Sequence, residues 1–158
     1  MESPHKVVVE TYFDGFRRSD HEQILACLTD DVAWDLPGYR HLTGKDAFDQ
    51  EIENEEFVGS PTLSVDRLVE EADTVVAIGN GETTHKSGER HRFVFCDVFT
   101  FAGDEICRVE SYLVPLTSWS DIVNSTVDRD RASATAPEDI ESEVEPGPVD
   151  GGAGRVSR

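Results

Sequence analysis

The chain has 158 residues, enough for one domain with a sizeable core. Its 33 acidic and 14 basic residues give a formal net charge of −19, which disfavours binding to nucleic acid or to anionic membranes. No apolar run is suited to a signal peptide or a membrane span, and three cysteines without a Cys-x-x-Cys pair favour free thiols in the cytoplasm.

Three helices are expected at the N-terminal end. The first, over residues 4–18, starts where Ser3 supplies a capping hydroxyl before a proline. The second, shorter helix is expected over residues 20–31. The third, over residues 43–57, is mostly acidic and therefore largely solvated.

The remaining core segments have the two-residue period of strands. A short strand is expected over residues 32–36, followed by a loop before the third helix. After a break at residues 59–61, four strands follow one another as a meander that ends at Pro115. This order predicts an α+β fold in which three N-terminal helices pack on a curved antiparallel sheet and form a cone with one pocket.

The composition changes near residue 120. Residues 120–158 are acidic, rich in Pro, Gly and Ser, and have no hydrophobic period. Such a segment cannot bury enough apolar surface to offset its chain entropy, so a disordered tail is expected after a domain over residues 1–119.

One carboxyl group occupies an unusual position in the predicted sheet. Asp97 lies in the middle of a strand face whose other members are aromatic. A buried charge is costly unless it is paired, hydrogen-bonded or neutralised, so Asp97 is expected to face a cavity or a dedicated partner. The aromatic members of that face are Phe93, Phe95, Phe99 and Phe101.

Several motifs resemble one superfamily. These are V-V-x-x-Y in the first helix, D-D-V-x-W before Pro-Gly, G-K-x-A at the third helix, and F-x-D-V-F-x-F with I-x-R-x-x-S-Y on the last two strands. Together they resemble the nuclear-transport-factor-2-like superfamily, and more narrowly the SnoaL-like proteins, which include polyketide cyclases and relatives of ketosteroid isomerase. The resemblance covers about residues 4–116 and implies the cone fold, but it implies no single activity.

The resemblance to ketosteroid isomerase suggests roles for two residues. That family uses a helix tyrosine and a protonated aspartic acid as an oxyanion hole. Matched on the motifs, these fall on Tyr12 and Asp97, the two candidate catalytic residues. The aromatic neighbours of Asp97 would raise its pKa, so that its carboxyl group could donate a hydrogen bond to an enolate or phenolate oxygen.

The general base of the isomerase is not preserved. That family has an Asp directly before a Pro, where this chain has Leu36. Asp35 is one residue away and is expected to face outward, which disfavours steroid-type isomerisation. A base would have to come from His41, Glu82 or Glu110. The polyketide cyclases also use a pocket acid to move a proton, and resemblance to them makes Asp97 a candidate for that role.

Two functions remain open. One is a cofactor-free acid–base enzyme, such as an isomerase, cyclase or dehydratase, acting on a hydrophobic enolisable carbonyl compound. The other is a non-catalytic domain for ligand binding or dimeric interaction. No metal site or cofactor motif is expected. The expected pocket residues are Phe16, Trp34, Leu36, His41, Phe95, Phe99 and Glu110.

A homodimer is also expected. The convex face of the sheet is half apolar and needs a cover, which a second copy of the chain would provide. The apolar residues expected on that face are Val94, Cys96, Val98 and Tyr112.

Overall fold

The computed structural model describes residues 2–116. The predicted tail over residues 120–158, and the predicted domain end at residue 119, lie outside the described residues. Within residues 2–116, no helix is both long and apolar enough to cross a membrane.

The predicted helix starts are confirmed. Helix α1, Pro4–Arg18, begins where the Ser3 hydroxyl accepts a hydrogen bond from the backbone N–H of Lys6, at 3.2 Å. Helix α2, His21–Ala26, begins where the Asp20 carboxylate accepts one from the N–H of Gln23, at 3.1 Å. Each cap satisfies a backbone donor that the helix itself leaves unpaired.

Two predicted helix ends are wrong. Helix α2 ends at Ala26, because the next strand already begins at Leu28. Helix α3, Lys45–Ile52, ends five residues before the predicted Phe57. The Asn54 side chain accepts a hydrogen bond from the backbone N–H of Glu56, at 3.0 Å, and this local bond favours a turn over a continued helix.

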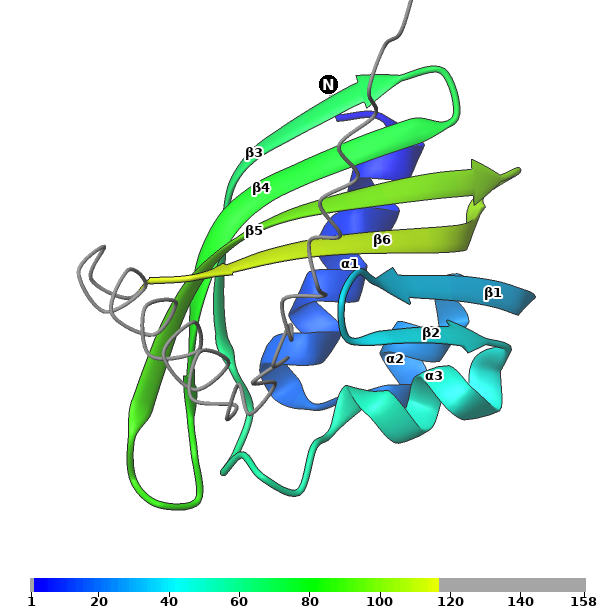
Figure 1. Cartoon of the computed structure of the whole chain (residues 1–158). Coiled ribbons are helices and arrows are strands. Elements are labelled where there is room, and N and C mark those ends of the chain that lie inside the picture. Colours follow the sequence, from blue (N-terminus) through cyan, green and yellow to red (C-terminus); the bar gives the residue numbers. More distant parts are fainter. Residues whose placement is uncertain (1, 117–158) are drawn as a thin grey trace, which may run out of the picture. The chain divides into compact units, whose positions relative to one another are not determined.

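Six strands form one sheet in the order β2-β1-β6-β5-β4-β3 (Figure 1). The expected α+β class is confirmed, but the sheet is mixed and not wholly antiparallel, because β1 runs parallel to β6. The predicted loop after β1 contains an additional strand, β2, which pairs antiparallel with β1. The strands are β1 Leu28–Leu36, β2 Arg40–Thr43, β3 Thr62–Glu71, β4 Thr74–Thr84, β5 Arg90–Ala102 and β6 Glu105–Pro115.

The long strands bend around α1 (Figure 1). A bulge between Val65 and Arg67 interrupts the pairing of β3 with β4. Opposite it, a Cβ atom at Gly79 would lie 2.0 Å from the Ser64 carbonyl oxygen and 2.7 Å from the Phe95 ring. Only glycine therefore lets β3 and the Phe95 ring approach β4 this closely.

The core lies between α1 and the concave face of the sheet. The Phe13 ring stacks on Phe95 with a centroid distance of 5.4 Å, and the Tyr12 ring meets Phe99 edge-on at 5.1 Å. Fully burying an aromatic side chain of this size contributes roughly 1.5–3 kcal/mol. Helices α2 and α3 lie beside β1 and β2, where Phe48 of α3 stacks on Trp34 at 4.4 Å.

Candidate functional site

A cavity of about 460 Å³ lies between α1, α3 and the concave face of the sheet. Its inner end is closed by buried residues of α1, β1, β5 and β6. Its mouth carries exposed apolar side chains, including Tyr39, which is 60% exposed, and Leu113, which is 53% exposed. The lining residues are Tyr12, Phe13, Phe16, Trp34, Leu36, Tyr39, Glu51, Ile52, Asn54, Glu56, Phe57, Pro61, Leu63, Thr83, Phe93, Phe95, Asp97, Ser111 and Leu113.

Asp97 lies at the inner end of this cavity. It is 8% exposed, and its Oδ1 atom is buried with no hydrogen-bond partner among the described residues. Burial raises the pKa of Asp97 from 3.8 to about 7, and the Ser111 hydroxyl acts in the opposite direction. The carboxyl group is therefore close to half-protonated at neutral pH, where it can both donate and accept a proton.

Ser111 links Asp97 to the indole of Trp34. It pairs with Asp97 across the β5–β6 ladder, and its Oγ atom accepts a hydrogen bond from Trp34 Nε1–H at 3.0 Å. That bond leaves the serine proton free to be donated to the Asp97 carboxylate. Sequence analysis missed Ser111, although its two-residue spacing from Val109 on β6 places both on the inner face.

Tyr12 supplies a second polar group beside Asp97. It lies on the buried face of α1, is 2% exposed, and packs between Phe99 and Phe48 with edge-on ring contacts at 5.1 and 6.2 Å. Burial, followed by the charge of Asp97, raises the pKa of Tyr12 well above its usual value. The phenol therefore stays protonated at neutral pH, where its hydroxyl can donate a hydrogen bond to a bound oxygen atom.

The other expected pocket residues divide into two groups. Phe16, Trp34, Leu36 and Phe95 line the same cavity as Tyr12 and Asp97. Phe99 does not line the cavity, because it is fully buried in the core against Tyr12.

His41 and Glu110 do not belong to this cavity, and the expectation that they line it is wrong. Both line a separate hollow of about 500 Å³ on the outer face of the sheet, so the fold has more than the single pocket expected. His41 Nδ1 is hydrogen-bonded to the Asp35 carboxylate. Arg108 bridges two carboxylates: its Nε donates to Asp35 Oδ2 at 2.9 Å, and its Nη2 lies 3.1 Å from Glu110 Oε1.

Strand alternation explains why these groups face outward. Glu110 lies between the inward-facing Val109 and Ser111, so its side chain points to the other face. Glu82, a third candidate base, pairs with Arg90 at 3.5 Å and does not line the cavity. No group of three or more potential metal ligands occurs among residues 2–116.

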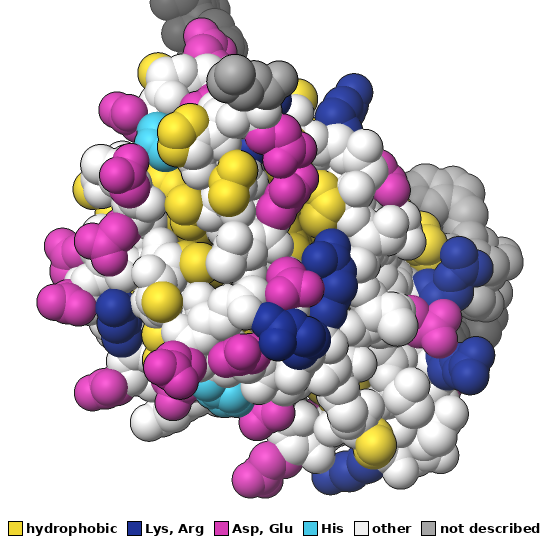
Figure 2. Space-filling model, turned by 180° about the vertical axis from the view of Figure 1, so that it is seen from behind, with side chains coloured by type: hydrophobic (Ala, Val, Ile, Leu, Met, Phe, Trp, Pro, Cys, Tyr) yellow, Lys and Arg dark blue, Asp and Glu magenta, His cyan; other side chains and the backbone are white. Residues whose placement is uncertain are grey.

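The surface around the fold is strongly acidic. Acidic side chains are spread over the face shown in Figure 2, with basic side chains between them. This distribution agrees with the formal net charge of −19.

Comparisons with known proteins identify relatives. A model of the SnoaL-like domain family matches residues 9–109. Several solved relatives are described as nuclear-transport-factor-2-like proteins. No curated protein sequence matches the chain significantly.

Three solved structures illustrate the fold. TerC, co-crystallised with polyporic acid, has a TM-score of 0.66 at 21% identity, over 80% of this chain and 99% of TerC. A putative polyketide cyclase from Xanthomonas campestris pv. campestris has a TM-score of 0.61 at 20% identity, over 77% and 95% of the two chains. A putative ketosteroid isomerase from Kribbella flavida has a TM-score of 0.59 at 21% identity, over 73% and 81%. At these identities the likeness establishes the fold and not an activity.

Proposed function

The chain belongs to the SnoaL-like domain family, and on this premise we propose that it is an acid–base enzyme whose cavity takes a small hydrophobic, enolisable carbonyl compound. The observation that carries the proposal is the buried Asp97 Oδ1 atom at the inner end of an aromatic cavity, which has no hydrogen-bond partner within residues 2–116. An unpaired buried polar atom lowers the free energy of unfolding by about 1–3 kcal/mol. Such an atom is therefore typical of a site where a bound ligand supplies the missing hydrogen bond. Perturbed carboxyl groups in clefts are typical of functional sites.

The residues divide the chemistry between them. Tyr12 donates a hydrogen bond to the substrate oxygen, which stabilises the negative charge of an enolate. Asp97 takes the proton from the carbon next to the carbonyl and returns it to the product, because its carboxyl group is buried at the inner end of the cavity, while His41 and Glu110 lie on the outer face. Isomerisation, aldol-type cyclisation and dehydration all fit this transfer, and none needs a cofactor.

Binding of naphthol tests the site. Trp34 lines the cavity and reports on binding through its fluorescence. We expect Asp97→Leu and Tyr12→Phe to weaken 2-naphthol binding at least roughly fivefold, about 1 kcal/mol each. The matched control is Asp35→Leu, which removes an aspartate from the opposite face of the sheet and should leave binding unchanged. Equal binding by the parent and all three variants would mean that Asp97 is structural.

A second function, ligand binding without catalysis, is favoured by Leu36. This apolar residue lines the cavity at the position where the isomerase has its base. Deuterium exchange into 2-tetralone, an enolisable aromatic ketone, separates the two functions. The enzyme hypothesis predicts exchange at least ~100-fold faster than without protein, and loss of that acceleration in Asp97→Asn. Binding of 2-tetralone without accelerated exchange would support the binding domain.

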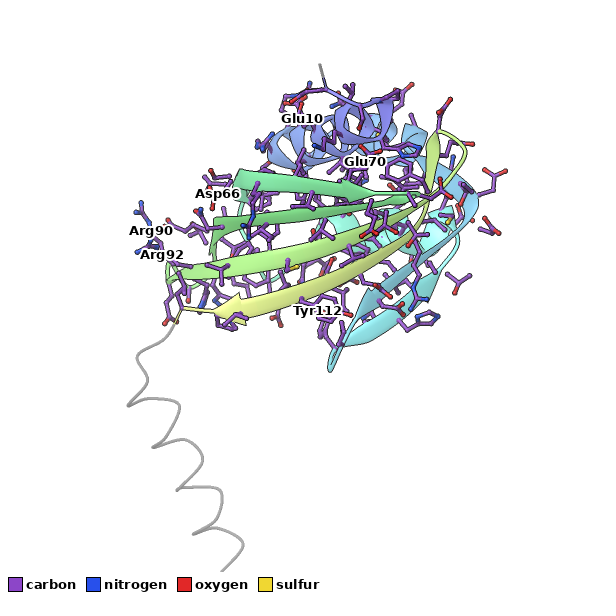
Figure 3. All side chains as sticks on the ribbon, turned by 90° about the horizontal axis from the view of Figure 1, so that it is seen from above. Glu10, Asp66, Glu70, Arg90, Arg92 and Tyr112 are labelled. Carbon is purple, nitrogen blue, oxygen red and sulfur yellow. The ribbon has the colours of Figure 1, made fainter. Side chains whose placement is uncertain are left out.

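We also propose that a second copy of the chain covers the outer face of the sheet. This face carries exposed Val94 and Tyr112, and Tyr112 lies on the side of β6 away from α1 (Figure 3). On β4, β5 and β6 the charges of this face cancel, because three arginines lie there with three glutamates, although the whole chain carries −19. Two copies can therefore approach through this face without the repulsion that the rest of the surface imposes. These charged residues are Arg90, Arg92, Arg108, Glu82, Glu105 and Glu110.

Light scattering at micromolar concentration tests the dimer. We expect a dimer for the parent and a monomer for Tyr112→Glu, since the change places two like charges in the shared face. Val7→Glu is the matched control, because Val7 on α1 and Tyr112 are both 47% exposed. A monomeric parent would refute the dimer.

We propose a cytoplasmic location on the basis of the cysteines. Cys27, Cys96 and Cys107 are all free thiols. Free thiols are typical of proteins in reducing compartments.

A further inference from the structure

The cavity contains no basic side chain among its described lining residues. Three of those residues are acidic, namely Asp97 at the inner end, Glu51, whose charge is paired with Arg40, and the exposed Glu56. The remaining lining residues are apolar or uncharged. A negatively charged ligand would therefore lose its hydration without gaining a positive partner.

Two arginines lie next to the cavity wall, but each is already bonded to a residue of that wall. Arg40 Nη1 is paired with Glu51 Oε2 at 2.7 Å, and its guanidinium lies over the Tyr39 ring, 5.1 Å from the centroid. Arg17 Nε donates to the backbone oxygen of Leu63 at 2.8 Å. Neither arginine is among the residues that line the cavity.

The single donor at the inner end matches a single oxygen atom. The Tyr12 hydroxyl can donate one hydrogen bond to a carbonyl oxygen, while the ionised Asp97 carboxylate, which takes the proton from the neighbouring carbon, would repel a negative charge. A carboxylate has a second oxygen, which would remain without a donor in an aromatic surrounding. An ammonium group is different, because the ionised Asp97 carboxylate can accept its hydrogen bonds and balance its charge.

We propose that the cavity selects its ligand by the sign of its charge, taking uncharged carbonyl compounds and tolerating ammonium groups while it excludes carboxylates. This inference rests on the proposed ligand cavity and narrows its substrate class. It means that the physiological substrate reaches the site as a neutral ketone or related carbonyl compound, and that a free acid of the same shape is not a substrate.

Three probes of nearly identical size test the selection. They are 2-acetylnaphthalene, which is neutral, 2-naphthoate, which is anionic, and 1-(2-naphthyl)ethylamine, which is cationic at neutral pH. We expect naphthoate to bind at least roughly 30-fold more weakly than the ketone, about 2 kcal/mol. The amine should bind within roughly tenfold of the ketone, about 1.4 kcal/mol. Binding is measured by calorimetry on the full chain at neutral pH.

A variant that adds a positive charge provides the complementary test. Thr83 lines the cavity and is half-buried on β4, so the long side chain in Thr83→Lys can reach a bound anion. We expect this variant to bind naphthoate at least roughly tenfold more tightly than the parent does. Thr83→Met adds a side chain of similar length without the charge, and it should not bind naphthoate more tightly than the parent does.

The outcomes separate the two proposals. Three results would each overturn the charge selection and leave the ligand cavity intact. They are naphthoate affinity within roughly threefold of that of the ketone, affinity of the amine as weak as that of naphthoate, and unchanged naphthoate affinity in Thr83→Lys. Binding of none of the three probes would overturn the proposed function, and the charge selection with it.

Discussion

Two aspartates on opposite faces of the same sheet behave in opposite ways. Asp97 faces inward and is buried, and burial raises its pKa to about 7. Asp35 faces outward, where the hydrogen bond from His41, followed by that from Arg108, holds its pKa below the usual value. The residue type is the same, so the difference comes from the surroundings.

The comparison shows which carboxyl group is available for chemistry. The Asp35 carboxylate is already bonded to His41 and Arg108 on the surface, so its charge is compensated and its oxygen atoms are not free to bind a ligand. The Asp97 Oδ1 atom has no partner among residues 2–116, and its protonation changes near neutral pH. A carboxyl group of this kind is suited to proton transfer.

The largest expected effect is the pH-dependent stability of Asp97→Asn. In the parent, Asp97 stays protonated up to about pH 7 when folded, but ionises near pH 4 when unfolded. The free energy of unfolding should therefore fall as the pH rises from about 4 to about 7. The isosteric amide removes this loss, so between about pH 4 and pH 8 the variant should gain up to about 4 kcal/mol relative to the parent.

Urea denaturation at a series of pH values measures this difference. All other acidic groups are common to both proteins, so their contributions cancel in the comparison. A difference between parent and Asp97→Asn that does not change with pH would show that Asp97 ionises normally in the folded protein.

Ser111→Ala should have the next largest effect. It removes the acceptor of the buried Trp34 Nε1–H and leaves that donor unpaired, at a cost of about 1–3 kcal/mol in the free energy of unfolding. It also removes the hydroxyl that lowers the pKa of Asp97, so that pKa should rise further. Ser111→Thr keeps a hydroxyl and serves as the control.

The pKa of Asp97 in these variants can be read by NMR from its side-chain carboxyl carbon. An unchanged pKa in Ser111→Ala, together with the expected loss of stability, would show that Ser111 supports only the indole and does not act on Asp97.

Asp35→Asn should have the smallest effect and the opposite sign. Arg108 is 50% exposed, so solvent screens the ion pair and its loss should cost below about 1 kcal/mol at neutral pH. The contribution of the pair should disappear as the pH falls through the lowered pKa of Asp35, and also at high salt. A large loss at neutral pH that persists in high salt would contradict this description of the outer face.

Local sequence patterns determined much of this protein. The capping residues located the starts of α1 and α2, and the two-residue period put Asp97 on the inner face and Asp35 on the outer face. The motifs identified the family. Each of these inferences depends on residues that are close in the chain, where backbone geometry relates spacing directly to direction.

Only the tertiary structure decided which groups share the cavity. The parallel pairing of β1 with β6 brings Trp34 to Ser111, 77 residues apart, and Asp35 to Arg108, 73 residues apart. Contacts at such separations leave no local pattern, because they depend on how strands from the two ends of the domain are ordered in the sheet. That order places Ser111 beside Trp34 in the cavity and His41 beside Asp35 on the outer face, while strand alternation alone already turns Glu110 outward.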